Sequence, residues 1–244
     1  MSEVQGRVAL VTGGTRGIGE AVSVALKNAG RFVVANYAGN EHAAADFQER
    51  TSIQVKRFDV SDSDATETAI RDIEAKFGPI EILVNNAGIT RDGTIHRMDR
   101  AQWQAVIDTN LSGCFNCSRS VIEGMRERCF GRIVNIGSIN GQAGQYGQVN
   151  YAAAKSGIHG FTKALAQEGA AKGITVNAIA PGYVDTEMVR AVPADVLEKI
   201  IARIPAGRLG RAEDIARGVL FLTADAADFV TGSTISINGG QHMY

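Results

Sequence analysis

The chain has 244 residues, and its 25 basic residues nearly balance 26 acidic ones, for a formal net charge of −1. Without a Lys- or Arg-rich run this balance predicts no nucleic-acid partner, and the absence of a signal peptide or a long apolar segment predicts no membrane contact. The low, odd number of cysteines fits a reducing compartment, so we expect a cytoplasmic protein without a disulfide framework and without a metal site.

Short apolar runs alternate with longer amphipathic stretches along the chain. In chain order, the runs predicted as strands are 7–12, 31–36, 53–59, 80–85, 131–137, 174–180 and 234–238. The stretches predicted as helices are 18–28, 41–50, 62–77, two long ones split near residues 110–111, then 151–172, 187–202 and 212–223. Continuous apolar strands that alternate with helices indicate a parallel sheet covered on both faces. We therefore predict one α/β domain over residues 1–244, a Rossmann-type doubly wound sheet of about seven strands.

A glycine-rich turn, TGGTRGIG, joins the first predicted strand to the first predicted helix. Glycines in this position permit a tight turn and let the backbone approach a pyrophosphate, while the helix N-terminus supplies N–H groups and partial positive charge. The spacing is looser than G-x-G-x-x-G, so an ordinary glycine turn is the alternative. The predicted cofactor contacts in the turn are Gly13, Gly14, Thr15, Arg16, Gly17, Ile18 and Gly19.

The end of the second predicted strand bears on the choice of dinucleotide. An acidic residue there would hydrogen-bond the 2′-hydroxyl of NAD. Here Asn36 and Tyr37 occupy that end, and no carboxylate follows until Glu41. Arg16 could reach a 2′-phosphate instead, so we predict NADPH rather than NADH, with Asn36 and Tyr37 beside the cofactor. The alternative for Arg16 is a solvated loop charge.

Tyr151 and Lys155 lie four residues apart at the start of a predicted helix and therefore share one face. A phenol has a pKa near ~10, and a nearby ammonium group lowers the pKa of a phenol toward the range that general acid–base catalysis requires. Ser138 ends a predicted strand, where its hydroxyl could donate to a substrate carbonyl. A surface Tyr–Lys pair and a serine that only caps a helix are the alternatives.

Two further polar features occupy this part of the chain. Asn85–Gly88 (NNAG) ends another predicted strand, and Asn110 interrupts a helical region, where an amide is mildly unfavourable and invites a functional explanation. An asparagine satisfied within the core is the alternative for Asn110. Cys114 and Cys117 have a C-x-x-C spacing, but no second pair or suitably spaced histidines accompany them, so we interpret them as packed helix residues.

These motifs together resemble the short-chain dehydrogenases/reductases over essentially the full chain. The resemblance implies that Tyr151 is the proton donor and that Ser138 positions and polarises the carbonyl. Lys155 would hold the nicotinamide ribose and assist Tyr151, and Asn110 would hold a water in a proton relay. The other cofactor contacts that it implies are Asp59, Val60, Asn86, Ala87, Gly88, Ile89, Pro181, Gly182, Tyr183, Val184 and Thr186. This intact set argues against a regulator that binds a nucleotide without turnover.

Within the family the chain is similar to the branch that reduces 3-oxoacyl thioesters, through the segments 88–92, 140–151 and 238–244. The resemblance implies NADPH-dependent reduction of acetoacetyl-CoA to (R)-3-hydroxybutanoyl-CoA, a precursor of polyhydroxybutyrate. The implied substrate contacts are Asp92, Ser138, Gln145, Tyr146, Gly147, Gln148, Tyr151, Gly182 and Tyr183. A merely polar loop is the alternative for the segment that precedes Tyr151.

The runner-up is a 3-oxoacyl-[acyl-carrier-protein] reductase of fatty acid synthesis. An acidic carrier protein would need cations on this chain, and Arg126, Arg128, Arg132 and Lys172 could supply them, although CoA phosphates would use cations too. The helices that contain 111–128 and 151–172 have apolar or small residues on more than one face. Family members pair such helices between subunits, so we expect a homotetramer; burial of both faces inside one subunit is the alternative.

Overall fold

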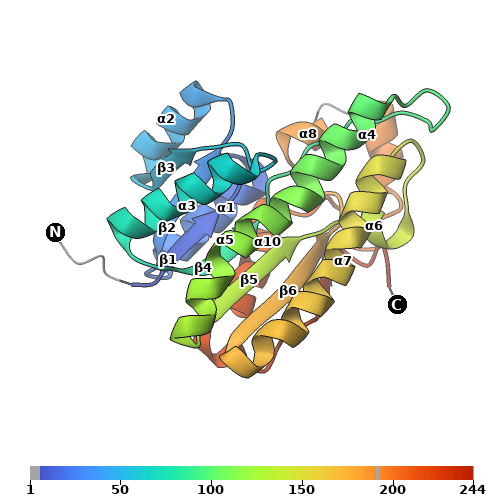
Figure 1. Ribbon diagram of the computed structural model, residues 1–244. Helices are drawn as coiled ribbons and strands as arrows, with labels where there is room; N and C mark the ends of the chain where they lie inside the picture. The colour runs from blue at the N-terminus through green and yellow to red at the C-terminus, as the bar shows by residue number, and fades with distance from the viewer. Residues whose placement is uncertain (1–5, 191–192, 244) are drawn as a thin grey trace.

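The computed structural model describes residues 6–190 and 193–243. Its centre is one parallel sheet of seven strands in the order β3-β2-β1-β4-β5-β6-β7 (Figure 1). The strands are β1 (Val8–Val11), β2 (Phe32–Tyr37), β3 (Gln54–Arg57), β4 (Ile80–Asn85), β5 (Gly131–Ile136), β6 (Ile174–Pro181) and β7 (Thr234–Ile237). The prediction of a Rossmann-type parallel sheet is confirmed.

Helices cover both faces of the sheet, which explains why its central strands are apolar at nearly every position. The helices are α1 (Gly17–Asn28), α2 (Glu41–Thr51), α3 (Ser63–Phe77), α4 (Arg100–Ile107), α5 (Gly113–Arg128), α6 (Ile139–Ala143), α7 (Val149–Gly169), α8 (Glu187–Arg190), α9 (Ala194–Ile201) and α10 (Ala212–Thr223). In Figure 1, α3, α5 and α7 lie in front of the sheet, and one core cluster joins them to its strands. A second cluster packs α1, α2 and α10 on the opposite face. None of these described helices is both long and apolar enough to cross a membrane.

Three segments differ from the sequence prediction. The helical run does not split near Asn110, because a π-helical turn (Asp108–Ser112) joins α4 to α5. The segment after Ser138 forms α6, a five-residue helix too short to show a periodic pattern. The predicted helix 187–202 is two helices, and α9 begins after Pro193 since proline favours a helix start over a helix interior. Residues 191–192 of that prediction, and Tyr244 of the C-terminal motif, lie outside the described residues.

All seven strands are parallel, so their carboxyl ends share one edge of the sheet, here called the carboxyl edge, and their starts share the amino edge. The strand order reverses between β1 and β4, where open α/β sheets bind ligands. The glycine-rich turn follows β1, Asn86–Gly88 follows β4, Ser138 follows β5 and Gly182 follows β6. The fold therefore gathers the predicted motifs along one edge.

Candidate active site

The glycine-rich turn is shaped by contacts with its own backbone. Gly13 has a φ of 59°, in the left-handed region that favours glycine. A Cβ on Gly19 would lie 2.0 Å from the carbonyl oxygen of Gly13, so no larger residue fits there. The start of α1 can therefore pack closely against the end of β1.

Two polar side chains brace this turn. Asn36 is 2% exposed, and its Oδ1 accepts a hydrogen bond from the Gly13 N–H at 3.1 Å while its Nδ2 donates to the Phe58 carbonyl at 2.8 Å. The Thr12 hydroxyl accepts from the N–H groups of Asn86 and Ala87 at 2.9 and 3.0 Å. Asn36 thus shapes the turn with its amide, while its predicted contact with the cofactor stays a prediction, and Thr12 is a bracing residue that our sequence analysis missed.

The N-terminus of α1 is suited to an anion. Side chains of Asn40, Asp62 and Asp99 cap α2, α3 and α4, but no side chain caps α1. The first-turn N–H groups and the positive end of the helix dipole therefore face the glycine-rich turn without a side-chain acceptor. This arrangement fits the pyrophosphate of a dinucleotide.

The ribose end of the predicted cofactor site contains two cations. The Arg16 side chain is 69% exposed and lies 3.9 Å from Glu187, an ion pair too long and too exposed to hold it firmly. Arg57 pairs in register with Tyr37 and donates from Nε to the Ala38 carbonyl at 3.2 Å, and it also forms an ion pair with Glu41. Our sequence analysis missed Arg57, although its position at the end of a strand next to β2 could have indicated it.

The other adenosine-side residues lie after β3. The Asp59 carboxylate is exposed, and its Oδ1 accepts from the N–H and the hydroxyl of Ser61 at 2.9 and 2.7 Å. Val60 is buried, and its carbonyl accepts from the Asn116 amide at 2.9 Å. These bonds hold the start of α3 in place at the carboxyl edge.

Three of the four predicted catalytic side chains come together where β5 meets α7. Lys155 is 3% exposed, and its Nζ donates to the Ile136 carbonyl at 2.7 Å and lies 5.7 Å from the centre of the Tyr151 ring. Ser138 caps α6 by accepting from the Asn140 N–H at 3.1 Å. The Tyr151 hydroxyl has no hydrogen-bond partner within residues 6–190 and 193–243, which leaves it open to a ligand.

Asn110, the fourth predicted catalytic residue, is fully buried in the π-helical turn. Its Oδ1 accepts from the Ile89 N–H at 2.8 Å and its Nδ2 donates to the Ile89 carbonyl at 2.9 Å, so the amide clamps the segment after β4. Gly88 lies against both the Asn110 amide and the Lys155 ammonium group. The side chain therefore positions this segment, and the proton-relay water stays a prediction.

The cysteines next to this site are structural. Cys114 donates from Sγ to the Asn110 carbonyl at 3.3 Å, and burial raises the pKa of its thiol to about 11 despite the nearby Lys155. Cys117 is buried as well, and both thiols are free. They are inert packed residues of α5, in agreement with their interpretation from the sequence.

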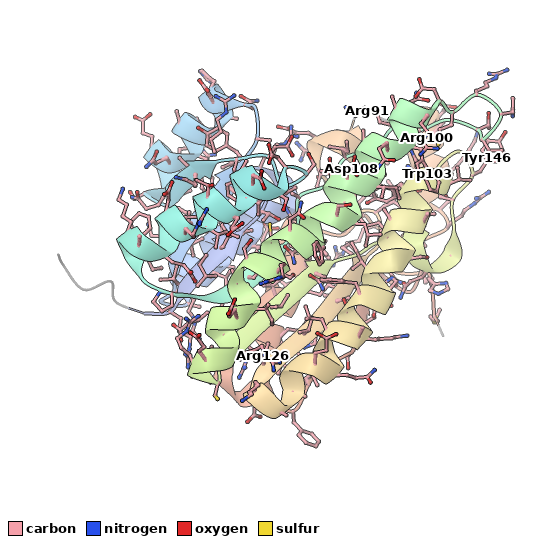
Figure 2. All side chains as sticks on the ribbon, in the orientation of Figure 1. Arg91, Arg100, Trp103, Asp108, Arg126 and Tyr146 are labelled. Carbon is pink, nitrogen blue, oxygen red and sulfur yellow. The ribbon has the colours of Figure 1, made fainter. Side chains whose placement is uncertain are left out.

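The predicted substrate residues divide into two groups. Gln148 donates from Nε2 to Asp92 Oδ2 at 2.9 Å, and Asn140 donates from Nδ2 to Gln148 Oε1 at 2.9 Å. Tyr183 is half-buried, and burial raises the pKa of its phenol. Gln145 and Tyr146 instead lie at an exposed loop tip, where Tyr146 projects from the rim of the molecule (Figure 2). That loop is tied back where the Gly147 carbonyl accepts from the Gly93 N–H at 2.8 Å.

The nicotinamide side of the predicted site lies at the end of β6. Pro181 is its last residue, and the N–H of Gly182 donates to the Ile237 carbonyl at 3.0 Å. Val184 is buried and forms an isolated bridge with Gly210, while Thr186 is half-buried next to Gly17. These residues face the glycine-rich turn across the carboxyl edge.

The cations predicted for an acidic carrier lie elsewhere. Arg126 and Arg128 end α5, and Arg132 and Lys172 precede or begin strands, so all four belong to the amino edge. Figure 2 shows Arg126 at the opposite end of the molecule from Arg91, Arg100 and Tyr146. Arg132 is buried and donates to the carbonyls of Gly173 and Asp225. Within one subunit these cations lie at the opposite edge of the sheet from Tyr151, and their part in binding a carrier protein stays a prediction.

Comparison with known proteins agrees with this geometry. The family model described as Enoyl-(Acyl carrier protein) reductase matches residues 13–242. The acetoacetyl-CoA reductase of Shinella zoogloeoides is 64% identical over 96% of this chain and 98% of its own. The acetoacetyl-CoA reductase of Cupriavidus necator is 48% identical over 97% and 98%. The 3-oxoacyl-[acyl-carrier-protein] reductase of Salmonella typhimurium is 45% identical over 98% of each chain. The chain belongs to the short-chain dehydrogenase/reductase family.

Proposed function

We propose that the protein reduces acetoacetyl-CoA to (R)-3-hydroxybutanoyl-CoA with NADPH. The observation that carries the reaction type is the buried Lys155 ammonium 5.7 Å from the Tyr151 ring, bound to the Ile136 carbonyl two residues before Ser138. Relatives named acetoacetyl-CoA reductase, 48–64% identical over nearly the whole chain, support the substrate. The (R) configuration follows from the family resemblance alone.

Each residue has a distinct part in this reaction. The nicotinamide cofactor, when bound, supplies the hydride that reduces the 3-carbonyl. Tyr151 gives its phenolic proton to the carbonyl oxygen, and the Ser138 hydroxyl donates a hydrogen bond to the same oxygen as negative charge develops. Lys155, held by the Ile136 carbonyl, stabilises the phenolate that remains on Tyr151.

The preference for NADPH rests on charge at the end of β2. Arg57 borders this end, Arg16 lies in the glycine-rich turn that bonds to Asn36, and the Asn36 amide is engaged with that turn and Phe58. A 2′-phosphate would gain charge-assisted hydrogen bonds from such cations, which a 2′-hydroxyl would not. Steady-state kinetics should therefore give a higher kcat/KM with NADPH than with NADH. Comparable values for the two cofactors would refute the preference.

The choice of acyl carrier requires a direct comparison. We expect a higher kcat/KM on acetoacetyl-CoA than on acetoacetyl-acyl-carrier protein at equal NADPH. Strong preference for the acyl-carrier protein would favour the alternative function, that of a 3-oxoacyl-[acyl-carrier-protein] reductase. Cytoplasmic location and a part in polyhydroxybutyrate synthesis stay predictions from the family resemblance.

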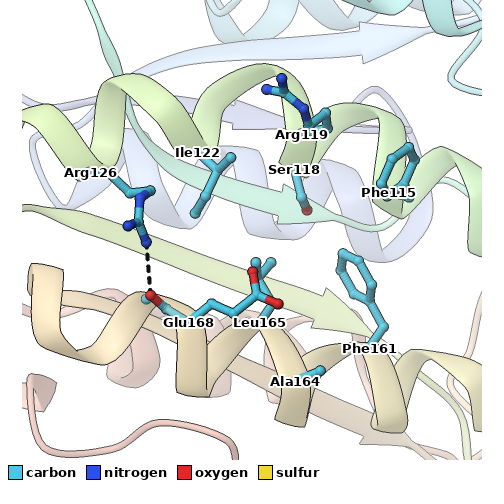
Figure 3. A pocket seen from close by; sticks show the side chains of 10 residues that line it. Phe115, Ser118, Arg119, Ile122, Arg126, Phe161, Ala164, Leu165 and Glu168 are labelled. Atoms are coloured by element: carbon cyan, nitrogen blue, oxygen red, sulfur yellow. Dashed lines mark hydrogen bonds between the residues drawn. The ribbon is translucent and has the colours of Figure 1, made fainter.

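We also propose the homotetramer, with a second copy of the chain on the face that α5 and α7 share. A hollow of about 590 Å³ lies between these helices, and Phe115, Ile122, Phe161 and Leu165 line it (Figure 3). Phe115 is 54% exposed, and Arg126 ties the two helices together through the Glu168 carbonyl at 2.9 Å. The same face on a second copy would cover this apolar surface and form a dimer. Two such dimers would join through a second face to give the tetramer.

Light scattering at micromolar concentration tests the assembly. We expect a tetrameric mass, and Phe115→Asp should lower it. Phe221 on α10 is similarly exposed, at 53%, so Phe221→Asp is a matched control that should leave intact the pair of subunits that α5 and α7 form. A monomeric mass for the unaltered chain would contradict the tetramer.

A further inference from the structure

A chain of amide and carboxylate groups connects three segments that surround Tyr151. Asn140 is on α6, Gln148 precedes α7, and Asp92 lies in the loop after β4. Nδ2 of Asn140 donates to Oε1 of Gln148 at 2.9 Å, and Nε2 of Gln148 donates to Oδ2 of Asp92 at 2.9 Å. The backbone N–H of Asn140 also donates to Ser138 Oγ at 3.1 Å. Asn140 thus contacts Ser138, the proposed carbonyl-binding serine, and Gln148, the residue before the helix that contains Tyr151.

The hydrogen bonds from Asn140 through Gln148 to Asp92 can run in only one direction, with each residue donating to the next. An ionised Asp92 accepts hydrogen bonds and cannot donate them. Gln148 must therefore turn its Nε2 toward Asp92, which leaves its Oε1 facing position 140. That position requires a donor, and the asparagine amide supplies one. A carboxylate there would place two acceptors against each other, and an apolar side chain would leave Oε1 unpaired.

Asn140 also reaches the other wall of the site. Its amide interacts with the phenol of Tyr183, which follows β6. Burial raises the pKa of Tyr183, and it outweighs the Asn140 amide, which lowers this pKa; the negative charge of Asp92 also raises it, so the phenol stays neutral and able to donate. One side chain therefore lies between Gln148 and Tyr183, both of them predicted substrate contacts.

We propose that Asn140 is a positioning residue, which fixes the direction of the Asp92–Gln148 hydrogen bonds and so orients Gln148 and Tyr183 toward the 3-oxoacyl group. The proposal rests on the proposed function for its substrate. Asn140 would act through its neighbours, since pre-organised donors bind a substrate better than side chains that must be ordered on binding. Its effect should therefore fall on the KM of the acyl substrate.

A double-mutant cycle tests the direction of these hydrogen bonds. Asn140→Asp should raise the KM of the acyl substrate about tenfold, because the half-buried hydrogen bond to Gln148 becomes a repulsion. Asp92→Asn should also raise it, because Gln148 loses the carboxylate that orients it. In the double variant every donor and acceptor is reversed: the new carboxylate at position 140 accepts from Gln148, which in turn accepts from the new amide at position 92. We expect the combined loss to be at least about fivefold smaller than the product of the single losses. KM for NADPH should not change.

The same four proteins are also unfolded in urea without substrate, and the free energies should show coupling of the same sign. Asn28→Asp makes the same chemical change at the exposed, amino-edge end of α1 and should leave KM unchanged. Kinetics use the 3-oxoacyl thioester that the unaltered enzyme reduces fastest, so a failure on acetoacetyl-CoA rejects the proposed function and not Asn140. The inference is overturned if the increase in KM of the double variant equals the product of the two single increases. Asn140 would then have only a structural part, even where unfolding shows coupling.

Discussion

The two edges of the sheet use polar side chains in opposite ways. At the amino edge, Arg7 forms ion pairs with Glu81 at 2.7 Å and Asp225 at 3.0 Å, and its guanidinium lies 3.6 Å from the centre of the Phe130 ring. Arg132 lies 4.5 Å from the same ring. Every charge in this cluster has partners within the chain, so the cluster joins strands and loops without offering a site.

At the carboxyl edge the polar groups are only partly engaged. Lys155 and Asn110 are fixed by the backbone, but the Tyr151 hydroxyl and the first turn of α1 keep capacity for a ligand in the part of the chain that the structure describes. The comparison teaches that the fold separates stability from function along the strands. Substitutions at the carboxyl edge should mainly change catalysis, and substitutions at the amino edge should mainly change stability.

Tyr151→Phe should have the largest effect on catalysis. Loss of a positioned general acid lowers rates by about 10²–10⁴-fold, so we expect kcat to fall within that range. The aromatic ring stays, so the melting temperature and the Kd of NADPH should be close to those of the unaltered protein. Pre-steady-state kinetics and fluorescence titration with NADPH provide the two measurements. A rate near the unaltered one would show that Tyr151 is not the proton donor, and it would reopen the possibility of a nucleotide-binding regulator.

Arg16→Ala should have a smaller effect, confined to one cofactor. We expect kcat/KM for NADPH to fall about tenfold, which corresponds to one charge-assisted hydrogen bond, and kcat/KM for NADH to change little. Arg71→Ala is the matched control, because the Arg71 side chain on α3 is also 69% exposed. Equal losses with both cofactors would mean that Arg16 contacts a phosphate that they share, and the proposed basis of selectivity would fail.

Long periodic or continuously apolar segments allowed much of the fold to be predicted from the sequence. β4 and α10 have the predicted bounds, because Gly78-Pro79 and a continuous amphipathic pattern mark them. α6 was missed because its five residues cannot show a helical period, and its stability comes from the Ser138 cap and from packing on α7. The join between α4 and α5 was missed because a π-helical turn shifts the period without ending the helix.

Which polar groups pair with each other was harder to predict than where they lie. The sequence places Asn36 at the end of a strand, but only its neighbours show that its amide binds Gly13 and Phe58. Arg57 belongs to no motif, and Asn140 only begins the segment 140–151 without a role assigned to it. Their roles depend on contacts with the end of β2 and with the start of α7. Motifs identify residues that have the same chemical role in many related proteins. The residues that hold them in place depend on tertiary contacts, which a single sequence does not reveal.

The smallest effect should come from the amino edge. Arg7→Met keeps an extended side chain over Phe130 but removes the ion pairs with Glu81 and Asp225. The Asp225 side chain is 63% exposed, so solvent screens the pair, and we expect a loss of only about 1 kcal/mol in the free energy of unfolding at pH 7. Urea unfolding measures this loss, and kcat at 25 °C should not change.

The pH dependence of this loss distinguishes charge from packing. The hydrogen bond from Arg7 is the largest effect on the pKa of Asp225 and lowers it; burial acts in the opposite direction, and the charge of Arg7 lowers the pKa further. A carboxyl group whose pKa is lower in the folded state binds fewer protons there than in the unfolded state. Its contribution is therefore complete above the unfolded pKa of about 4 and is lost as the pH falls through the folded value. The difference between the unaltered protein and Arg7→Met should accordingly shrink between pH 5 and pH 3, leaving only the contribution of packing on Phe130. A difference that stays constant over this range would assign the stability of the amino edge to the ring contact and not to its ion pairs.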